Sequence, residues 1–173
     1  GIKKENVMQR KHYVDLGNKI NMRIDYNEYD EEQTGIFTTH SDYLRVIQLA
    51  RLRGITPEQQ YNLREHSQDL SVRDLKILDN ELKAYKKQYG LIDFNDMISE
   101  FIKSDVCPKF DTVFIDEAQD LSRMQWDMAT ALMFNAEDAF IAGDDDQAIF
   151  RWAGADVDSF ITQTGKILNL AQS

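Results

Sequence analysis

The sequence predicts an α/β fold, in which a short parallel sheet with flanking helices is joined to a mostly helical subdomain. Residues 110–142 contain two short apolar runs on either side of a helical pattern, whereas residues 39–90 contain three helical patterns. Continuous apolar runs are typical of parallel strands that are covered on both faces. The sequence therefore predicts a mostly helical part that is followed by a sheet region.

Composition limits the class of protein. The 173 residues, of which 42% are hydrophobic, suffice for one domain with a subdomain. No apolar run approaches the ~20 residues that span a bilayer, and no signal peptide is visible, so we expect a cytoplasmic protein without a membrane partner. The single cysteine, Cys107, fits a reducing compartment. The net charge of −10 argues against a self-sufficient DNA-binding module, which is normally basic.

The first 35 residues carry weaker signals. Val7–Leu16 has a helical pattern, and the alternation of apolar residues over Ile20–Tyr26 favours a short strand. The acidic stretch Asp25–Gln33 is interpreted as a solvated loop or helix edge.

A helix over Tyr43–Arg53 is predicted from its start and stop signals. Thr39 and Asp42 form a capping box before it, and Gly54 would end it. The basic residues of the helical subdomain have two interpretations, a track for a phosphate backbone or ordinary solvated faces. These residues are Arg45, Arg51, Arg53, Lys83, Lys86 and Lys87.

Two more helices follow. Thr56–Pro57 begins the first, with Gln59 at the capping-box position. Ser71 and Asp74 open the second, which Gly90 ends. Its apolar positions recur at helical spacing and are Leu75, Leu78, Leu82, Tyr85 and Tyr89.

Helices are also predicted on both sides of the first apolar run. Asp93 caps a helix that begins with Asp93–Ile98 and returns the chain to the sheet. Ser122 and Gln125 open another helix, which runs to about Phe134. Trp126 is expected to pack on the sheet, because a Trp at helical spacing is more often a core residue than a ligand platform.

The first apolar run ends at two carboxylates. Val113–Ile115 reads as a buried strand, and Asp116 and Glu117 follow at its C-terminal end, where open α/β sheets bind ligands. Mg²⁺ prefers oxygen ligands and usually takes only one or two from the protein. One carboxylate would hold the metal while the other orients or deprotonates a water. The alternative is an ordinary pair of exposed loop acids.

The second apolar run repeats this arrangement. Ala139–Ala142 is followed by Gly143, three aspartates at Asp144–Asp146, and Gln147. If both strands end at one cleft, Gln147 lies near whatever the metal holds. Its amide can orient a water or bind a phosphate oxygen without adding negative charge.

Two motifs at these strand ends resemble a known family. Asp116–Asp120 is similar to the Walker B motif of superfamily 1 helicases. Gly143–Gln147, together with Phe150, Trp152 and Gly154–Ala155, resembles the next motif of the UvrD/Rep/PcrA branch. Three positions depart from that motif: Ala148 replaces the usual Ser, Phe150 the more frequent Tyr, and Ala153 a common Arg.

The resemblance implies a role for each matching residue. Asp116 would be the Mg²⁺ ligand, and Glu117 the base that acts on the attacking water. Gln147 would sense the γ-phosphate of ATP, as both a catalytic and a nucleotide-binding group. Phe150 and Trp152 match positions that stack on DNA bases, a sequence-tolerant contact. A packing role for Trp152 is the alternative.

The resemblance also implies an architecture and an activity. Residues 93–173 would be the Walker B half of the first RecA-like core (1A-like), and residues 1–92 the helical subdomain inserted in it (1B-like). The parent protein would hydrolyse ATP with Mg²⁺, move 3′ to 5′ on single-stranded DNA and unwind duplex junctions in DNA repair or replication. The alternatives are a RecB-type helicase–nuclease subunit and a truncated, non-catalytic interaction module.

We expect this chain to be an internal piece of such a helicase. It contains no Gly-x-x-x-x-Gly-Lys-Ser/Thr loop, and Ile167–Ser173 resembles the approach to the family's next motif. Without that phosphate-binding Walker A loop, the piece alone should be inactive and its ATP site empty. An uncovered sheet edge would favour self-association. The aspartate run Asp144–Asp146 points to a phage lineage.

Overall fold

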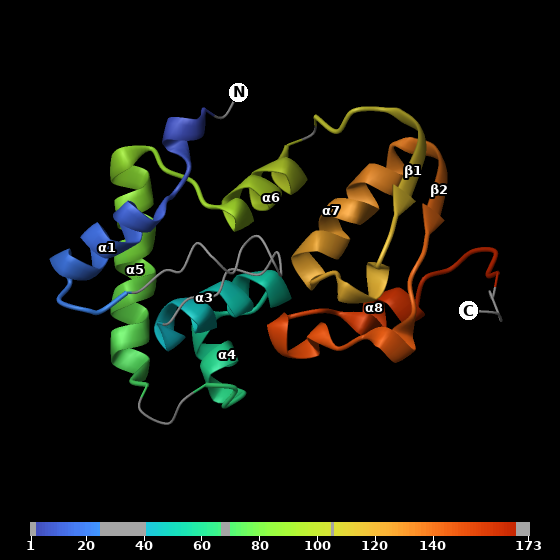
Figure 1. The fold of residues 1–173 in the computed structure, drawn as a ribbon. Coiled ribbons are helices and arrows are strands. Elements are labelled where there is room, and N and C mark those ends of the chain that lie inside the picture. Colours follow the sequence, from blue (N-terminus) through green and yellow to red (C-terminus); the bar gives the residue numbers. More distant parts are fainter. Residues whose placement is uncertain (1–2, 25–40, 67–69, 105, 169–173) are drawn as a thin grey trace.

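The computed structural model describes residues 3–24, 41–66, 70–104 and 106–168. In this part of the chain, four helices lie on one side, a two-stranded parallel sheet with two helices lies on the other, and α6 lies between them (Figure 1). The elements are α1 (Arg10–Lys19), α3 (Asp42–Arg53), α4 (Pro57–Asn62), α5 (Val72–Tyr89), α6 (Phe94–Lys103), β1 (Phe110–Ile115), α7 (Arg123–Phe134), β2 (Ala136–Ile141) and α8 (Val157–Ile161). None of the described helices is long and apolar enough to cross a membrane.

The predicted helix boundaries are mostly confirmed. Thr56 and Gln59 form the capping box of α4, and Gly54 and Gly90 end α3 and α5 in the left-handed conformation, with φ of 68° and 61°. The cap of α3 differs from the prediction. The side chain of Ser41 accepts a hydrogen bond from the backbone N–H of Leu44, and Thr39 lies outside the described residues.

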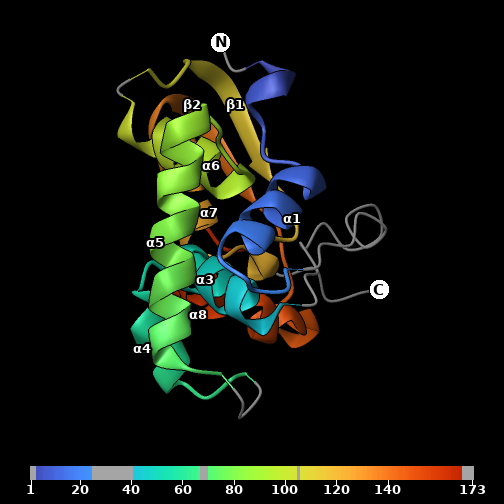
Figure 2. The same ribbon diagram turned by 90° about the vertical axis from the view of Figure 1, so that its left-hand side faces the viewer.

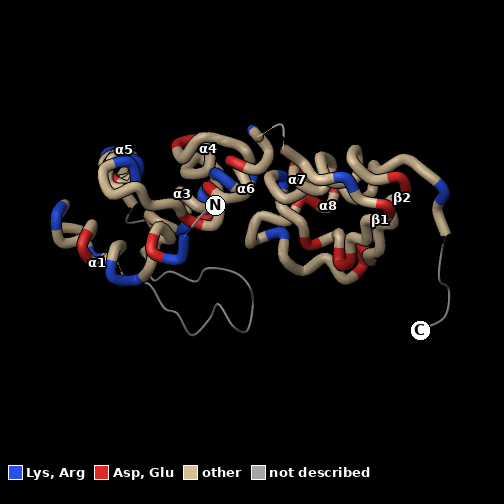
Figure 3. Tube along the Cα trace, turned by 90° about the horizontal axis from the view of Figure 1, so that it is seen from above, with Lys and Arg blue, Asp and Glu red and all other residues tan. Residues whose placement is uncertain are grey.

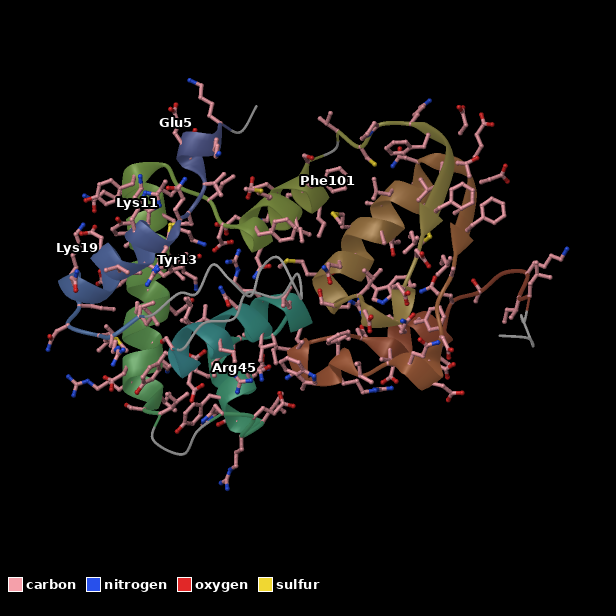
Figure 4. The ribbon with its side chains drawn as sticks, in the orientation of Figure 1. Glu5, Lys11, Tyr13, Lys19, Arg45 and Phe101 are labelled. Carbon is pink, nitrogen blue, oxygen red and sulfur yellow. The ribbon has the colours of Figure 1, made fainter. Side chains whose placement is uncertain are left out.

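The helical subdomain packs around α5. Its buried apolar side chains come from α1, α3 and α5, which lie side by side in both views (Figures 1 and 2). Tyr89, the last of the apolar positions predicted at helical spacing in α5, is 48% exposed. Its ring instead meets Lys19 at the end of α1 (Figure 4), whose ammonium lies 4.8 Å from the ring centroid and donates to the Tyr89 hydroxyl at 2.9 Å.

The strand predicted over Ile20–Tyr26 is wrong for the described residues 20–24. Ile20 caps α1, and Asn21 turns the chain at a φ of 53°. Met22 then donates its backbone N–H to the Gly17 carbonyl at 2.9 Å, so the alternating side chains fold back onto α1. The loop predicted over Asp25–Gln33 lies outside the described residues.

Four charged side chains connect α3, α5 and α6. Arg51 donates to Asp93 at 2.7 Å and to Asp96 at 2.5 Å, and Lys86 donates to both carboxylates at 2.7 Å. Burial lowers the pKa of Arg51, but Asp93 and Asp96 outweigh it and leave that pKa raised. Asp93 also caps α6, as predicted, and the cluster joins that cap to the helical subdomain.

The two strands are parallel and in register, with Phe114 opposite Phe140 and Ile115 opposite Ile141. Helix α7 covers the face that carries Ile115 and Ile141, where Trp126 is buried as predicted. The prediction that the first strand is covered on both faces is wrong for the described residues. Phe114 is 75% exposed and Phe140 55%, because no described element packs on their face, where the two rings stack 5.0 Å apart.

The segment before α1 lies beside the segment after α5. Val7 and Ile92 form a parallel bridge, in which Met8 donates to the Ile92 carbonyl and Ile92 donates to the Asn6 carbonyl, both at 2.8 Å. The segments before α1 and after α5 therefore lie side by side.

Candidate nucleotide and DNA site

Asp116 and Glu117 follow β1 directly at its C-terminal end, as the sequence predicts. Asp116 is exposed and its Oδ1 accepts the backbone N–H of Glu117 at 2.9 Å. Glu117 has a φ of 50°, in the left-handed region that costs an L-residue roughly 1–2 kcal/mol. Asn21 and Arg64 also have positive φ, so this conformation is not confined to the strand end.

A buried glutamine connects the two strand ends. Gln119 is 1% exposed, its Nε2 donates to Glu117 Oε2 at 2.7 Å, and its Oε1 accepts the backbone N–H of Asp144 at 3.0 Å. Asp144 in turn accepts from the Gln147 amide at 2.5 Å. Because the strands are parallel, Glu117 and Gln147 lie at the same edge of the sheet and share one hydrogen-bonded chain.

Gly143 allows this connection by its lack of a side chain. A Cβ at this position would lie 2.5 Å from Gln119 Oε1 and 2.9 Å from the Phe160 ring. Both distances are far below a van der Waals contact. The glycine is therefore required so that the loop after β2 can approach Gln119.

Asp120 is the least satisfied polar group of the site. Its Oδ1 is buried and has no hydrogen-bond partner among the described residues. Burial and the nearby charge of Glu117 both raise the pKa of Asp120. The negative charge of Glu117 therefore disfavours ionisation of Asp120.

Phe150 and Trp152 lie in a short 3-10 turn, Phe150–Ala153, that follows Gln147. Trp152 is 57% exposed, and its ring centroid lies 6.4 Å from that of the half-buried Phe150. The structure therefore contradicts a core packing role for Trp152. Beyond the turn, Ala155 forms an antiparallel bridge with Ser122, which joins the turn to the start of α7.

The residues present fit Mg²⁺ but not a triphosphate. Asp116 offers exposed oxygen atoms of the kind that Mg²⁺ binds, and the described residues contain no group of three or more metal-ligating side chains. Between Asp111 and Asp146 the only basic residue is Arg123, which pairs with Asp127 at 3.1 Å. Figure 3 shows acidic residues concentrated in the half that contains the sheet.

The basic residues of the helical subdomain are mostly engaged within the fold. Arg51 and Lys86 belong to the partly buried charged cluster with Asp93 and Asp96, which favours a structural role for these two. Arg53 binds Glu65, Arg45 donates to the Glu65 carbonyl, and Lys83 pairs with Asp79. The alternative interpretation, structural or solvated side chains, describes them better.

The sequence patterns did not predict the roles of Gln119 and Arg53. Gln119 is the fourth residue of the Asp116–Asp120 motif, so its place in the motif was visible, but its burial between two strand ends depends on the sheet register. Arg53 donates to the carbonyl of Arg151, which is 98 residues away in the sequence, so no local sequence pattern predicts that contact.

Comparisons with known proteins identify a family. A family model described as UvrD/REP helicase N-terminal domain matches residues 3–167. ATP-dependent DNA helicase PcrA of Bacillus subtilis is 33% identical over 93 residues, which are 49% of this chain and 12% of PcrA. RecBCD enzyme subunit RecB of Buchnera aphidicola is 33% identical over 104 residues, 54% of the chain and 9% of RecB. ATP-dependent DNA helicase Rep of the same bacterium is 28% identical over 110 residues, 58% of the chain and 17% of Rep.

The chain thus spans less than a fifth of each of these relatives. The family model, in contrast, covers nearly all of the chain, including both motifs at the strand ends. The resemblance read from the two motifs is confirmed, and this chain belongs to the UvrD/REP helicase N-terminal domain family.

Proposed function

We propose that this chain is part of an ATP-dependent DNA helicase that moves 3′ to 5′ on single-stranded DNA and unwinds duplex junctions in DNA repair or replication in the cytoplasm. Residues 93–173 form the Walker B half of a 1A-like RecA core, and residues 1–92 form its 1B-like insertion. The observation that carries the proposal is the hydrogen-bonded chain from Glu117 to Gln147 across the two strand ends.

In this proposal the residues at the strand ends divide the hydrolytic work. Asp116 would hold Mg²⁺ in the whole protein, where the ion would supply charge neutralisation for the phosphates of ATP. Glu117 takes the proton from the attacking water, and Gln119 fixes its carboxylate through the 2.7 Å hydrogen bond. Gln147 lies on the same chain of contacts and would contact the γ-phosphate end of a nucleotide bound by the whole protein.

Phe150 and Trp152 supply the DNA contact. Their turn follows Gln147 by only a few residues, so the proposed DNA contact is adjacent along the chain to the proposed nucleotide contact. An exposed indole beside a second ring suits base stacking, which is indifferent to sequence.

The test is the substitution Glu117→Gln in the whole helicase protein that carries this chain. It keeps the size and hydrogen bonding of the side chain but removes the base, so turnover of ATP should fall roughly 10²–10⁴-fold while ATP binding survives. Asp116→Asn should instead weaken Mg²⁺-dependent nucleotide binding. Near-normal steady-state hydrolysis by the Glu117→Gln variant would contradict the proposed role.

For the chain by itself we propose an inactive state. Phosphate affinity in this class comes largely from a Walker A loop and its lysine, which the sequence lacks. The exposed pair Phe114 and Phe140 and the free strand edges favour association between copies. Calorimetric titration with Mg²⁺-ATP and light scattering test the two parts. Micromolar ATP binding contradicts the first part, and a strictly monomeric mass contradicts the second.

A RecB-type helicase–nuclease subunit is the second candidate, because the chain is 33% identical to a RecB over 104 residues. The two candidates predict different products. A nuclease subunit would shorten a labelled DNA strand in the presence of Mg²⁺, whereas a helicase alone would only separate the strands. Denaturing gel analysis of the reaction distinguishes them.

A further inference from the structure

The aromatic turn Phe150–Ala153 rests on α3 of the helical subdomain. Arg53, the last residue of α3, donates from Nη2 to the Arg151 carbonyl at 3.1 Å. Gly154, which ends the turn at a φ of 102°, lies against Leu49 and Leu52, since a Cβ there would meet their side chains at 3.5 and 3.6 Å. Ala153 is buried at this contact. The turn that exposes Trp152 is thus packed and hydrogen-bonded to α3.

Arg53 is itself held in place. Its Nη1 donates to Gln60 Oε1 at 2.8 Å and to Glu65, while Gln60, which is 1% exposed, also donates to Glu65 at 3.0 Å. The hydrogen bond from Arg53 lowers the pKa of Glu65. One guanidinium therefore links α4 and the segment after it to the aromatic turn.

We infer that Arg53 is a positioning residue that fixes Trp152 for DNA through the Arg151 carbonyl, so that the helical subdomain sets the geometry of the DNA contact. The inference rests on the proposed role of Trp152. In this inference Arg53 affects DNA affinity although Arg53 itself contacts neither DNA nor nucleotide. The planar guanidinium is suited to this, because its fork of donors can bind Glu65, Gln60 and the turn at once.

The test compares Arg53→Gln with Arg45→Gln in the 173-residue chain. Arg45 lies on the same helix (Figure 4) and donates to the carbonyl of Glu65, but not to the turn, which makes it a matched control. Trp152 fluorescence is obtained by subtracting the spectrum of a Trp152→Phe chain, in which buried Trp126 is the remaining tryptophan. Arg53→Gln should lower the anisotropy of Trp152 and increase its quenching by acrylamide, whereas Arg45→Gln should leave both unchanged.

Binding of fluorescein-labelled oligo(dT) is measured on the whole protein with the same variants. Arg53→Gln should weaken binding by roughly 10-fold, which corresponds to one lost hydrogen bond from a charged group. Arg53→Lys is the control that separates loss of the contact from unfolding of the chain. It keeps the charge beside Glu65 but loses the fork, so it should melt near the wild-type temperature and still release Trp152.

The outcomes separate the two claims. Unchanged Trp152 anisotropy and quenching in Arg53→Gln and Arg53→Lys overturns the inference, as does an equal change in Arg45→Gln. Altered anisotropy together with oligo(dT) binding that is insensitive to Trp152→Ala means that Arg53 positions the turn but the proposed DNA role of Trp152 is wrong.

Discussion

Gln119 and Glu117 are joined by a 2.7 Å hydrogen bond in which a fully buried amide holds a carboxylate at the edge of the sheet. The same amide accepts from the backbone of the loop after β2. The position of the proposed base and that of the loop bearing Gln147 are therefore set by one side chain. This relationship explains why a polar residue occupies a completely buried site.

Gln119→Leu should destabilise the chain. The leucine fills a similar volume but leaves the backbone N–H of Asp144 without its acceptor, which costs about 1–3 kcal/mol. Urea unfolding followed by circular dichroism measures the loss. Gln163→Leu, which removes a hydrogen bond from a half-buried glutamine near the surface, is the control and should cost less. Equal stabilities for the two variants would contradict the role of Gln119.

Glu117→Gly and Glu117→Ala should differ in stability although both remove the carboxylate. At a φ of 50° the alanine keeps the left-handed strain and the glycine does not, so the glycine variant should be more stable by about 1 kcal/mol. Both variants of the whole helicase should lose ATP hydrolysis. A glycine variant that unfolds first in urea would show that the conformation carries no strain.

Trp152→Ala and Trp126→Ala should have opposite effects. Trp152 is 57% exposed, so its loss should weaken single-stranded DNA binding of the whole protein by roughly 5- to 150-fold, the equivalent of one stacked base, with little change in melting. Trp126 is 3% exposed, so its loss should cost about 3–5 kcal/mol of stability. Thermal melting beside a DNA titration separates the two effects. A large shift in the melting temperature of Trp152→Ala would contradict the assignment of Trp152 as an exposed DNA contact.

Acid should destabilise the chain through Asp93. Burial alone would raise the pKa of Asp93, but Arg51 and Lys86 outweigh it and hold that pKa below the ordinary value of 3.8. Because the folded-state pKa is the lower one, the contribution to the free energy of unfolding is complete above pH 3.8. It is lost as the pH falls through the folded pKa. Unfolding titrations between pH 7 and pH 3 measure this slope.

The Asp93→Asn variant tests the origin of that slope. It should lose roughly 3–5 kcal/mol at pH 7, since two cations remain partly unpaired, and show a smaller decrease below pH 4. Asp127→Asn, which breaks an exposed pair with Arg123, should change neither. If the free energy of unfolding of Asp93→Asn falls as steeply with acid as that of the unsubstituted chain, the decrease comes from other carboxylates.

The sequence predicts the local structure of this chain better than it predicts which side chains are buried. The caps Thr56, Ser71, Asp93 and Ser122 are correct because each depends on a few neighbouring residues. The exposure of Phe114 could not be predicted, because an apolar strand is covered only if another element packs on it. Within the described residues, Ile20–Ile24 likewise alternates without any partner strand.

For the site, the sequence predicts which residue types gather but not what connects them. Asp116, Glu117 and Gln147 follow from two strand ends and the parallel rule. The burial of Gln119 and the contact from Arg53 to the Arg151 carbonyl depend on the three-dimensional register of distant segments. Arg51 and Lys86 show the same limit, because their partial burial depends on two carboxylates from a different segment of the chain.

The bridge between Val7 and Ile92 has an evolutionary consequence. A module whose entry and exit are neighbours can be lengthened, shortened or exchanged by recombination without rethreading the strands that follow. In this sense the helical subdomain is an exchangeable unit. Any replacement would have to reproduce the contacts of Arg51 and Lys86 with the two carboxylates and the contact of Arg53 with the Arg151 carbonyl.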